Sequence, residues 1–226
     1  MSLRDHLFGA PQDERNFATP DVARFVPEAG EPFVLDRSAG REVYMKFEAS
    51  PEIWALNPTP GPRGDVIYKD DMGEPILRAT RLGGLTLFTP DRPEGMAAAY
   101  MGQGPALRPP PVFSASALLQ SFTQASGRAG RAAGRSLLFQ AENFPPGAAA
   151  LIADAATLVG EAFVEVAATG DRGRRQLARF GKVRFDLGRN PVAEAKGDTV
   201  KITIAPERGL AGRPSSHRIA AALTKR

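Results

Sequence analysis

The chain lacks cysteine, and it has only 2 histidines and 1 tryptophan among its 226 residues. The absence of cysteine excludes disulfide frameworks, zinc knuckles and cysteine nucleophiles. Histidine is the side chain used most often for acid–base catalysis and often for binding metals, and only His6 and His217 are present. We therefore predict no catalytic residue, no metal site and no bound cofactor.

Long hydrophobic runs are also missing. The most apolar stretch, 148–159, is shorter than the roughly 20 residues that span a bilayer, and it carries Asp154. We therefore expect no transmembrane segment. The N-terminus, Met-Ser-Leu-Arg-Asp-His, has no hydrophobic signal region. We expect a periplasmic protein if an export signal has been removed, and a cytoplasmic one otherwise.

Charge is unevenly distributed along the chain, whose net charge is +4. Residues 1–110 carry 12 Lys+Arg and 16 Asp+Glu, whereas residues 111–226 carry 17 and 9. A basic half favours an anionic partner such as nucleic acid, a membrane surface or an envelope polymer. The alternative is that the two halves face each other or differ only in their solvated surfaces.

The N-terminal half has the pattern of short strands. Residues 1–32 contain 4 prolines, which indicates an irregular arm with at most one helical turn near 21–25. Period-2 alternation over 43–48 is typical of a β-strand, and the short loops that follow favour antiparallel pairing. We predict an antiparallel β-meander over 33–90 and a Pro/Gly-rich linker over 91–112.

The C-terminal half has the pattern of two long helices. Segment 114–135 has helical apolar spacing behind a capping serine, Ser114 or Ser116. Glycines inside it predict either a break or close packing between helices. Segment 148–169 is the clearest helix, because its apolar residues form one stripe.

Two alternating apolar runs, 183–187 and 200–204, predict a short antiparallel strand pair, with 192–195 as a further strand between them. Segment 214–224 predicts a C-terminal helix. The fold class is therefore α+β: an N-terminal antiparallel β-meander, a helical hairpin, a short antiparallel strand pair and a C-terminal helix. The predicted parts are an irregular arm, a β-rich part and an α+β part, the last two packed as one compact unit: residues 1–32, 33–108 and 109–226.

Arginine clusters in the basic half are candidate contacts for an anionic partner. Arg128, Arg131 and Arg135 share one helical face at spacing i, i+3, i+7. A second cluster follows at 172–179. The simpler alternative is that the acidic face of 148–169 pairs with the first cluster across the helical hairpin.

A third candidate is the stretch 209–216, Gly-Leu-Ala-Gly-Arg-Pro-Ser-Ser. It places Arg213, Ser215 and Ser216 at the start of a helix, where a phosphate or carboxylate can be held. The alternative is a turn whose serine caps the helix. A serine–histidine dyad with His217 is disfavoured, because adjacent helical positions point about 100° apart.

Three stretches resemble an uncharacterised family, a domain of unknown function from Caulobacter-like alphaproteobacteria. They are 64–78, 82–90 and 209–216, and the resemblance runs over most of 30–222. The resemblance implies a chain that begins with an export signal, and it carries over no activity and no residue role.

These observations favour a non-enzymatic periplasmic protein of the bacterial envelope that binds a macromolecular or anionic partner. One alternative is a hydrolase of glycans or phosphoesters, which needs two carboxylates in a cleft and could use Glu48, Asp65, Asp70 or Asp71. The other is a nucleic-acid-binding protein that uses the basic half. The sequence leaves the ligand and the oligomeric state open.

Overall fold

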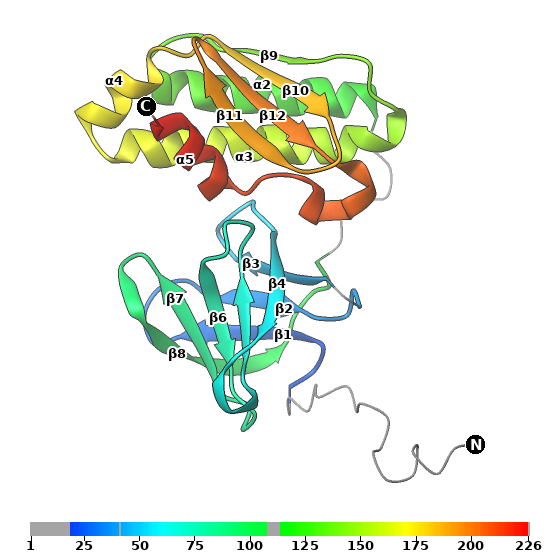
Figure 1. Ribbon diagram of the computed structural model, residues 1–226, viewed down its shortest axis with the longest axis vertical. Coiled ribbons are helices and arrows are strands. Elements are labelled where there is room, and N and C mark those ends of the chain that lie inside the picture. Colours follow the sequence, from blue (N-terminus) through cyan, green and yellow to red (C-terminus); the bar gives the residue numbers. More distant parts are fainter. Residues whose placement is uncertain (1–18, 41, 108–113, 226) are drawn as a thin grey trace.

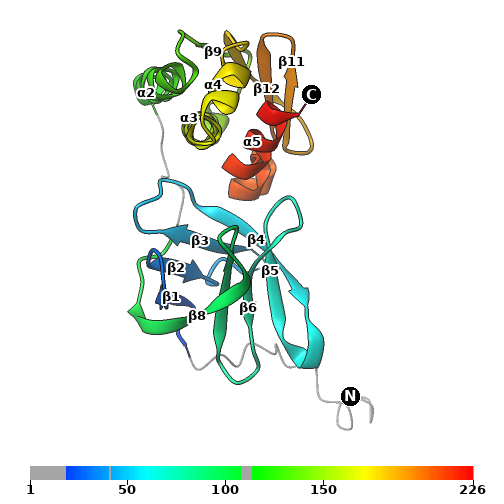
Figure 2. The ribbon, with the colours of Figure 1, turned by 90° about the vertical axis from the view of Figure 1, so that its left-hand side faces the viewer.

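The computed structural model describes residues 19–40, 42–107 and 114–225 and places them in two lobes (Figure 1). The first lobe is all β, and the second combines helices with a small sheet. Each lobe has its own core of buried apolar side chains. Figure 2 shows the 3-10 helix η3 (Pro206–Gly212) and the start of helix α5 (Ser216–Thr224) facing the first lobe.

The first lobe is a closed barrel of eight antiparallel strands in chain order. It closes because β1 pairs with both β2 and β8. Alternate side chains point inward and fill the interior with residues such as Phe33, Met45 and Leu77, each 0% exposed. The strands are β1 (Val22–Pro27), β2 (Phe33–Asp36), β3 (Val43–Phe47), β4 (Trp54–Pro60), β5 (Val66–Lys69), β6 (Pro75–Ala79), β7 (Leu85–Thr89) and β8 (Arg92–Gln103), with the 3-10 helix η1 (Pro62–Gly64) between β4 and β5.

Closure of the barrel corrects the predicted open meander. Strand β1 occupies the segment predicted to be an irregular arm with a helical turn, and β8 occupies the segment predicted to be a linker. Pro20 precedes β1 and Pro27 is its last residue, so neither proline interrupts the strand. Its buried positions alternate strictly. The pairing of Phe25 with Tyr100 joins the two ends of the sheet, a contact that no local pattern reveals.

Strand β4 contains Pro58 and Pro60, although the three prolines of 57–62 indicate a loop from sequence alone. Pro58 and Pro60 pair in register with Tyr68 and Val66 of β5. The register with β3 on the other side stops at Leu56. Among the described residues, the prolines therefore lie where β4 pairs with β5 alone, and a missing N–H donor on the other side of β4 leaves no ladder bond unmade there.

The second lobe is a mixed sheet covered by helices. Its strand order is β11-β12-β10-β9, with β10 parallel to β9 and to β12, and with β11 antiparallel to β12. Figure 1 shows α2 and α3 behind the strands. The elements are α2 (Ala115–Ala133), β9 (Leu138–Ala141), η2 (Pro146–Ala148), α3 (Ala149–Ala168), α4 (Asp171–Leu177), β10 (Lys182–Leu187), β11 (Val192–Lys196) and β12 (Thr199–Ile204), followed by η3 and α5.

The predicted antiparallel pair of 183–187 with 200–204 is wrong. Strands β10 and β12 run parallel, with Val183 opposite Val200. The reversal occurs between β11 and β12, which form a hairpin through the turn at Gly197, so β11 lies at the edge of the sheet instead of between the other two. Strand β9 was not predicted, because four residues are too few to show a period.

The long helices begin and end close to where the sequence indicates. Ser114 caps α2 by accepting a hydrogen bond from the Ala117 amide at 3.2 Å, and Gly134 ends it in the left-handed region at φ 67°. The helix does not break at its glycines. Close packing comes instead from Gly160 of α3, where an added Cβ would lie 3.5 Å from the Ala125 carbonyl of α2.

The helical segment Pro146–Ala168 is long and apolar enough to cross a membrane by length and composition, with a mean hydropathy of 1.5. Within the protein, 67% of its apolar window is buried, as expected of a core helix. One such helix is weak evidence for a membrane span. The expected absence of a transmembrane segment stays a prediction.

Candidate functional site

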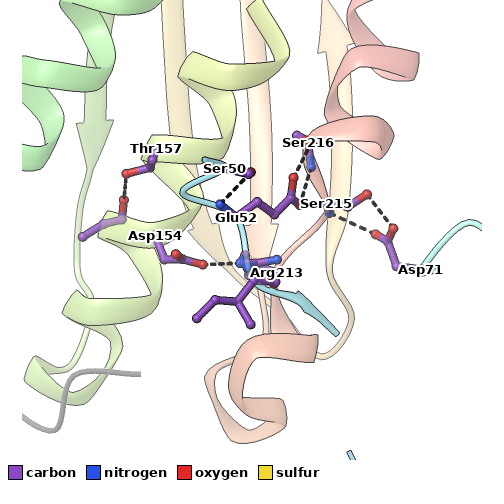
Figure 3. A network of polar contacts seen from close by, with 10 residues as sticks. Ser50, Glu52, Asp71, Asp154, Thr157, Arg213, Ser215 and Ser216 are labelled. Carbon is purple, nitrogen blue, oxygen red and sulfur yellow. Dashed lines mark hydrogen bonds and ion pairs between the residues drawn. The ribbon is translucent and has the colours of Figure 1, made fainter. Parts of the chain in front are cut away.

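The loop that leads from η3 into α5 makes contacts with both lobes. Arg213, at its centre, is only 3% exposed. Its guanidinium forms an ion pair with Asp154 of α3, and its Nη2 donates to the Ile53 carbonyl of the barrel lobe at 2.6 Å. Figure 3 shows the Arg213 side chain between Asp154 and the chain that carries Glu52. One buried cation therefore contacts both lobes.

The first residues of α5 hold two carboxylates that belong to the barrel lobe (Figure 3). The amide and hydroxyl of Ser215 donate to Asp71 at 3.1 and 2.6 Å. Those of Ser216 donate to Glu52 at 3.1 and 2.5 Å. The start of a helix favours negative charge, because its N–H groups are unpaired and its dipole is positive there.

We call these six residues the interlobe network: Glu52, Asp71, Asp154, Arg213, Ser215 and Ser216. The structure brings together the three members that the sequence singled out, Arg213, Ser215 and Ser216. Their partners in the structure are carboxylates of this same chain and not of a ligand. The capping alternative applies as well, because the Ser215 hydroxyl accepts from the Arg218 amide at 3.0 Å.

Glu52 is the member that sequence reasoning missed. It is 3% exposed, and its burial raises the pKa of its carboxyl above the ordinary value, an effect opposed by the charge of Arg213 and by the hydrogen bonds from Ser216. No local signal identifies this residue, because its partner Ser216 lies 164 positions further along the chain.

Replacing Glu52 with glutamine should make stability less dependent on pH. The folded-state pKa of Glu52 lies above its ordinary value of 4.5. Its contribution to stability is therefore complete below pH 4.5 and is lost as pH rises through the folded-state pKa. Glutamine can accept from the Ser216 amide and donate to its hydroxyl. Urea unfolding between acid and neutral pH should show Glu52→Gln gaining on the wild type as pH rises; parallel profiles would contradict this assignment.

A cavity of about 260 Å³ lies beside the interlobe network. Most of its charged groups already have partners. Arg218 forms an ion pair with Asp71 at 2.8 Å, Arg208 donates to Asn190 at 3.2 Å, and Asp70 accepts from two backbone amides of its own turn. Across residues 19–40, 42–107 and 114–225, no group of three or more His, Asp or Glu side chains is placed to hold a metal ion.

The carboxylates considered for hydrolysis have separate structural partners. Glu48 pairs with Arg24 at 2.5 Å, and this hydrogen bond lowers the pKa of Glu48. Asp65 is buried and pairs with Arg78 at 2.5 Å. Asp71 belongs to the interlobe network, and Asp70 stabilises its turn. Of this set, only Asp70 and Asp71 line the cavity.

The first arginine cluster consists of two residues of α2 and Arg135, which lies just after that helix. Arg128 forms an ion pair with Glu161 of α3 at 2.7 Å, so the alternative of pairing across the helical hairpin holds for this residue. Arg131 is exposed in the last turn of α2. Arg135 donates to the Ala178 carbonyl just after α4, at 3.0 Å. The C-terminal end of α2 is therefore tied to the segment that carries the second arginine cluster.

Helix α4 lies at the end of the lobe where α3 also ends (Figure 1). Its arginines Arg172, Arg174 and Arg175 are exposed. The carboxylate of Asp171 lies 3.4 Å from Arg174 in an exposed pair. The structure therefore joins the two arginine clusters that the sequence places 37 residues apart, counting from Arg135 to Arg172. We call this surface the basic end; it consists of Arg131, Arg135, Arg172, Arg174 and Arg175.

Of the two histidines, His6 lies outside the described residues. His217 is in α5, with its Nε2 3.7 Å from a carboxylate oxygen of Glu165 and its ring edge against Trp54. The hydroxyls of the neighbouring Ser215 and Ser216 donate hydrogen bonds to Asp71 and Glu52.

One family model matches residues 2–223, with the description "Domain of unknown function (DUF4908)". The chain belongs to this family. No curated protein and no solved structure matches it.

Proposed function

We propose that this member of the family is a binding protein without a catalytic role, and that it holds an anionic macromolecular partner at its basic end. The observation that supports the proposal is the convergence of five arginines at one end of the α/β lobe: one in α2, one just after α2, and three in α4. Among the described residues, the ion pair found there joins Asp171 to one of them, Arg174. Helix C-termini attract cations, which accounts for arginines at this end, but their number leaves a clear excess of positive charge.

Binding is favoured over hydrolysis by the use that the chain makes of its carboxylates. Asp65, Asp71 and Asp154 each pair with an arginine. Glu52, whose pKa is raised, is 3% exposed and held by Ser216. Two carboxylates with opposite protonation states on either side of an open cleft, the arrangement for glycosidic chemistry, are not assembled among the described residues.

An anionic surface or polymer that binds through its charge is favoured over a single-stranded nucleic acid. Single strands bind by stacking bases on exposed aromatic rings. Phe180, the aromatic residue nearest to the second arginine cluster in sequence, is 0% exposed and packs against Phe163. Phe122 and Phe139 pack against each other in the core of the lobe.

The envelope of an alphaproteobacterium, and the periplasm in particular, is the compartment that we propose for this interaction. It follows from the family resemblance, which implies exported relatives. Anionic phospholipid headgroups and anionic envelope polymers share the chemistry that arginines bind, because both present phosphate or carboxylate groups.

Charge reversal at the basic end should weaken binding to an anionic surface. Each basic residue near an anionic membrane contributes about 1 kcal/mol. The double variant Arg172→Glu, Arg175→Glu should therefore bind vesicles rich in phosphatidylglycerol at least ~30-fold more weakly than the wild type. Co-sedimentation at low and at physiological salt measures the effect, which salt should weaken.

The matched control is Arg92→Glu, Arg189→Glu, which changes the net charge by the same amount at exposed positions away from the basic end. It should bind as the wild type does. Equal losses in both double variants would mean that only the net charge matters and would refute a localised site. Retention by duplex DNA but not by vesicles, with the same dependence on Arg172 and Arg175, would replace the anionic surface by nucleic acid.

A further inference from the structure

A groove of about 820 Å³ runs between strand β11 and helix α5. It opens on the side of the α/β lobe where the sheet ends, because β11 is its edge strand. Nothing in the proposed use of the basic end involves this groove. Its lining consists of Arg179, five consecutive residues of β11 and its turn, and four residues from 218 to 225.

The β11 side of the groove is formed by the edge of the strand. Successive side chains of a strand point to opposite faces of the sheet. A groove over one face would therefore touch every second residue. This groove touches all residues of 193–197, so it follows the main chain. An edge strand has unpaired N–H and C=O groups along its open side, and these can pair with a further strand.

The α5 side of the groove is a single helical face. Its lining residues are Arg218, Ala221, Ala222 and Lys225. The first three lie in α5 at spacing i, i+3 and i+4, which places them on one face of the helix, and Lys225 directly follows the helix. The two alanines are opposite a strand whose own groove residues include Ala193 and Ala195. Small side chains on both sides leave room for the backbone of an added segment.

The charges around the groove favour an acidic occupant. Among the described residues, four cationic side chains line it, from Arg179, Lys196, Arg218 and Lys225, against one carboxylate, that of Glu194. Arg218 is compensated by Asp71. Arg179 donates to the carbonyls of residues 223 and 225 at 3.3 Å, and these acceptors carry no net charge.

We propose that this edge groove binds an extended acidic peptide segment of a partner protein. The segment lies beside β11 as a fifth strand of the sheet, with its main chain paired to the open edge. Its acidic side chains reach Lys196, Lys225 and Arg179, and its small or β-branched side chains cover the alanines of α5. This is recognition by strand addition, in which main-chain bonds give affinity and charge gives selectivity.

A fluorescein-labelled peptide that alternates glutamate with threonine is a suitable probe, with the lysine–threonine peptide as its counterpart. Fluorescence anisotropy should show binding of the acidic peptide alone. Lys196→Glu, Lys225→Glu should weaken that binding by at least about tenfold, because like charges then face each other. Ala221→Gln, at an exposed helical position that tolerates glutamine, should also weaken it by filling the groove.

Hydrogen exchange separates strand addition from a simple charge contact. Bound acidic peptide should slow exchange of the amides in 193–197, and these amides should be unaffected by the lysine–threonine peptide. The double variant Arg92→Glu, Arg189→Glu should bind the acidic peptide as the wild type does.

Binding that leaves the β11 amides unprotected, or that survives Lys196→Glu, Lys225→Glu, would overturn the proposal. Absence of any peptide binding would overturn it too. The proposed function is tested separately, because Arg172→Glu, Arg175→Glu is measured on vesicles and leaves the edge groove intact. Either result can therefore fail while the other stands.

Discussion

Replacing Arg213 with alanine should lower the free energy of unfolding by about 3–5 kcal/mol, the usual cost of removing one partner of a buried ion pair. The guanidinium is buried, and it contacts Asp154 of the α/β lobe and the Ile53 carbonyl of the barrel lobe. Burial raises the pKa of Glu52, and the charge of Arg213 opposes that rise. Without it, two carboxylates and a carbonyl at the lobe interface lose their positive partner.

Urea unfolding followed by tryptophan fluorescence measures the effect directly. Trp54 is the only tryptophan, and it lies at the interface with its ring against His217. The matched control is Arg184→Ala, which removes an arginine from an exposed pair with Asp186 and should change little. Equal effects of the two variants would show that the interlobe network does not stabilise the contact between the lobes.

Local patterns predicted the elements whose determinants are local. Hydroxyl residues just before apolar helical spacing predicted a cap at Ser114 or Ser116 and another at Ser215 or Ser216; in the structure, Ser114 and Ser215 accept a helix N–H. The helix at 148–169 followed from its apolar stripe and is found as α3, Ala149–Ala168. Such features depend on neighbours within one or two turns, so a single sequence contains them.

Features that depend on pairing between distant parts of the chain were not predicted. Barrel closure requires β1 to pair with β8, which brings Phe25 to Tyr100. The parallel alignment of β10 with β12 depends on where β11 turns back, and alternation alone is the same in parallel and antiparallel strands. An open meander and an antiparallel pair are the arrangements that short loops suggest, and both were wrong.

The candidate site divides along the same line. Residues Arg213, Ser215 and Ser216 were identified from their types and spacing, but Glu52 and Asp71 were not identified as their partners. Pairing of Arg128 with the acidic face of the second helix was one of the alternatives, and the structure confirms it: the partner is Glu161. The joining of Arg135 to the segment after α4 depends on tertiary packing. Binding of an anionic partner and location in the envelope stay predictions.

Replacing Gly212 with alanine should lower the free energy of unfolding by about 3 kcal/mol, the upper part of the range for overpacking. An added Cβ would lie 2.0 Å from the Ala205 carbonyl oxygen and 2.9 Å from its carbon. Both are backbone atoms. The two residues are also held together by a hydrogen bond, in which the Ala205 amide donates to the Gly212 carbonyl at 2.7 Å. The η3 loop must therefore shift.

Gly147→Ala is the matched control, because an added Cβ there has nothing within 4 Å and neither glycine has a positive φ. It should be neutral or stabilising by about 0.4–1 kcal/mol. Urea unfolding compares the two variants. Similar values for both would show that the loop has room that the structure does not give it.

A double variant tests whether Gly212 acts through Arg213, its neighbour in the chain. If the shifted loop withdraws the guanidinium from Asp154, the loss from Arg213→Ala is already included in the loss from Gly212→Ala. The two substitutions together should then cost clearly less than the sum of the single effects, by an interaction energy of about 1–3 kcal/mol. Additive effects would mean that the clash at Ala205 is relieved on the η3 side, leaving the interlobe network in place.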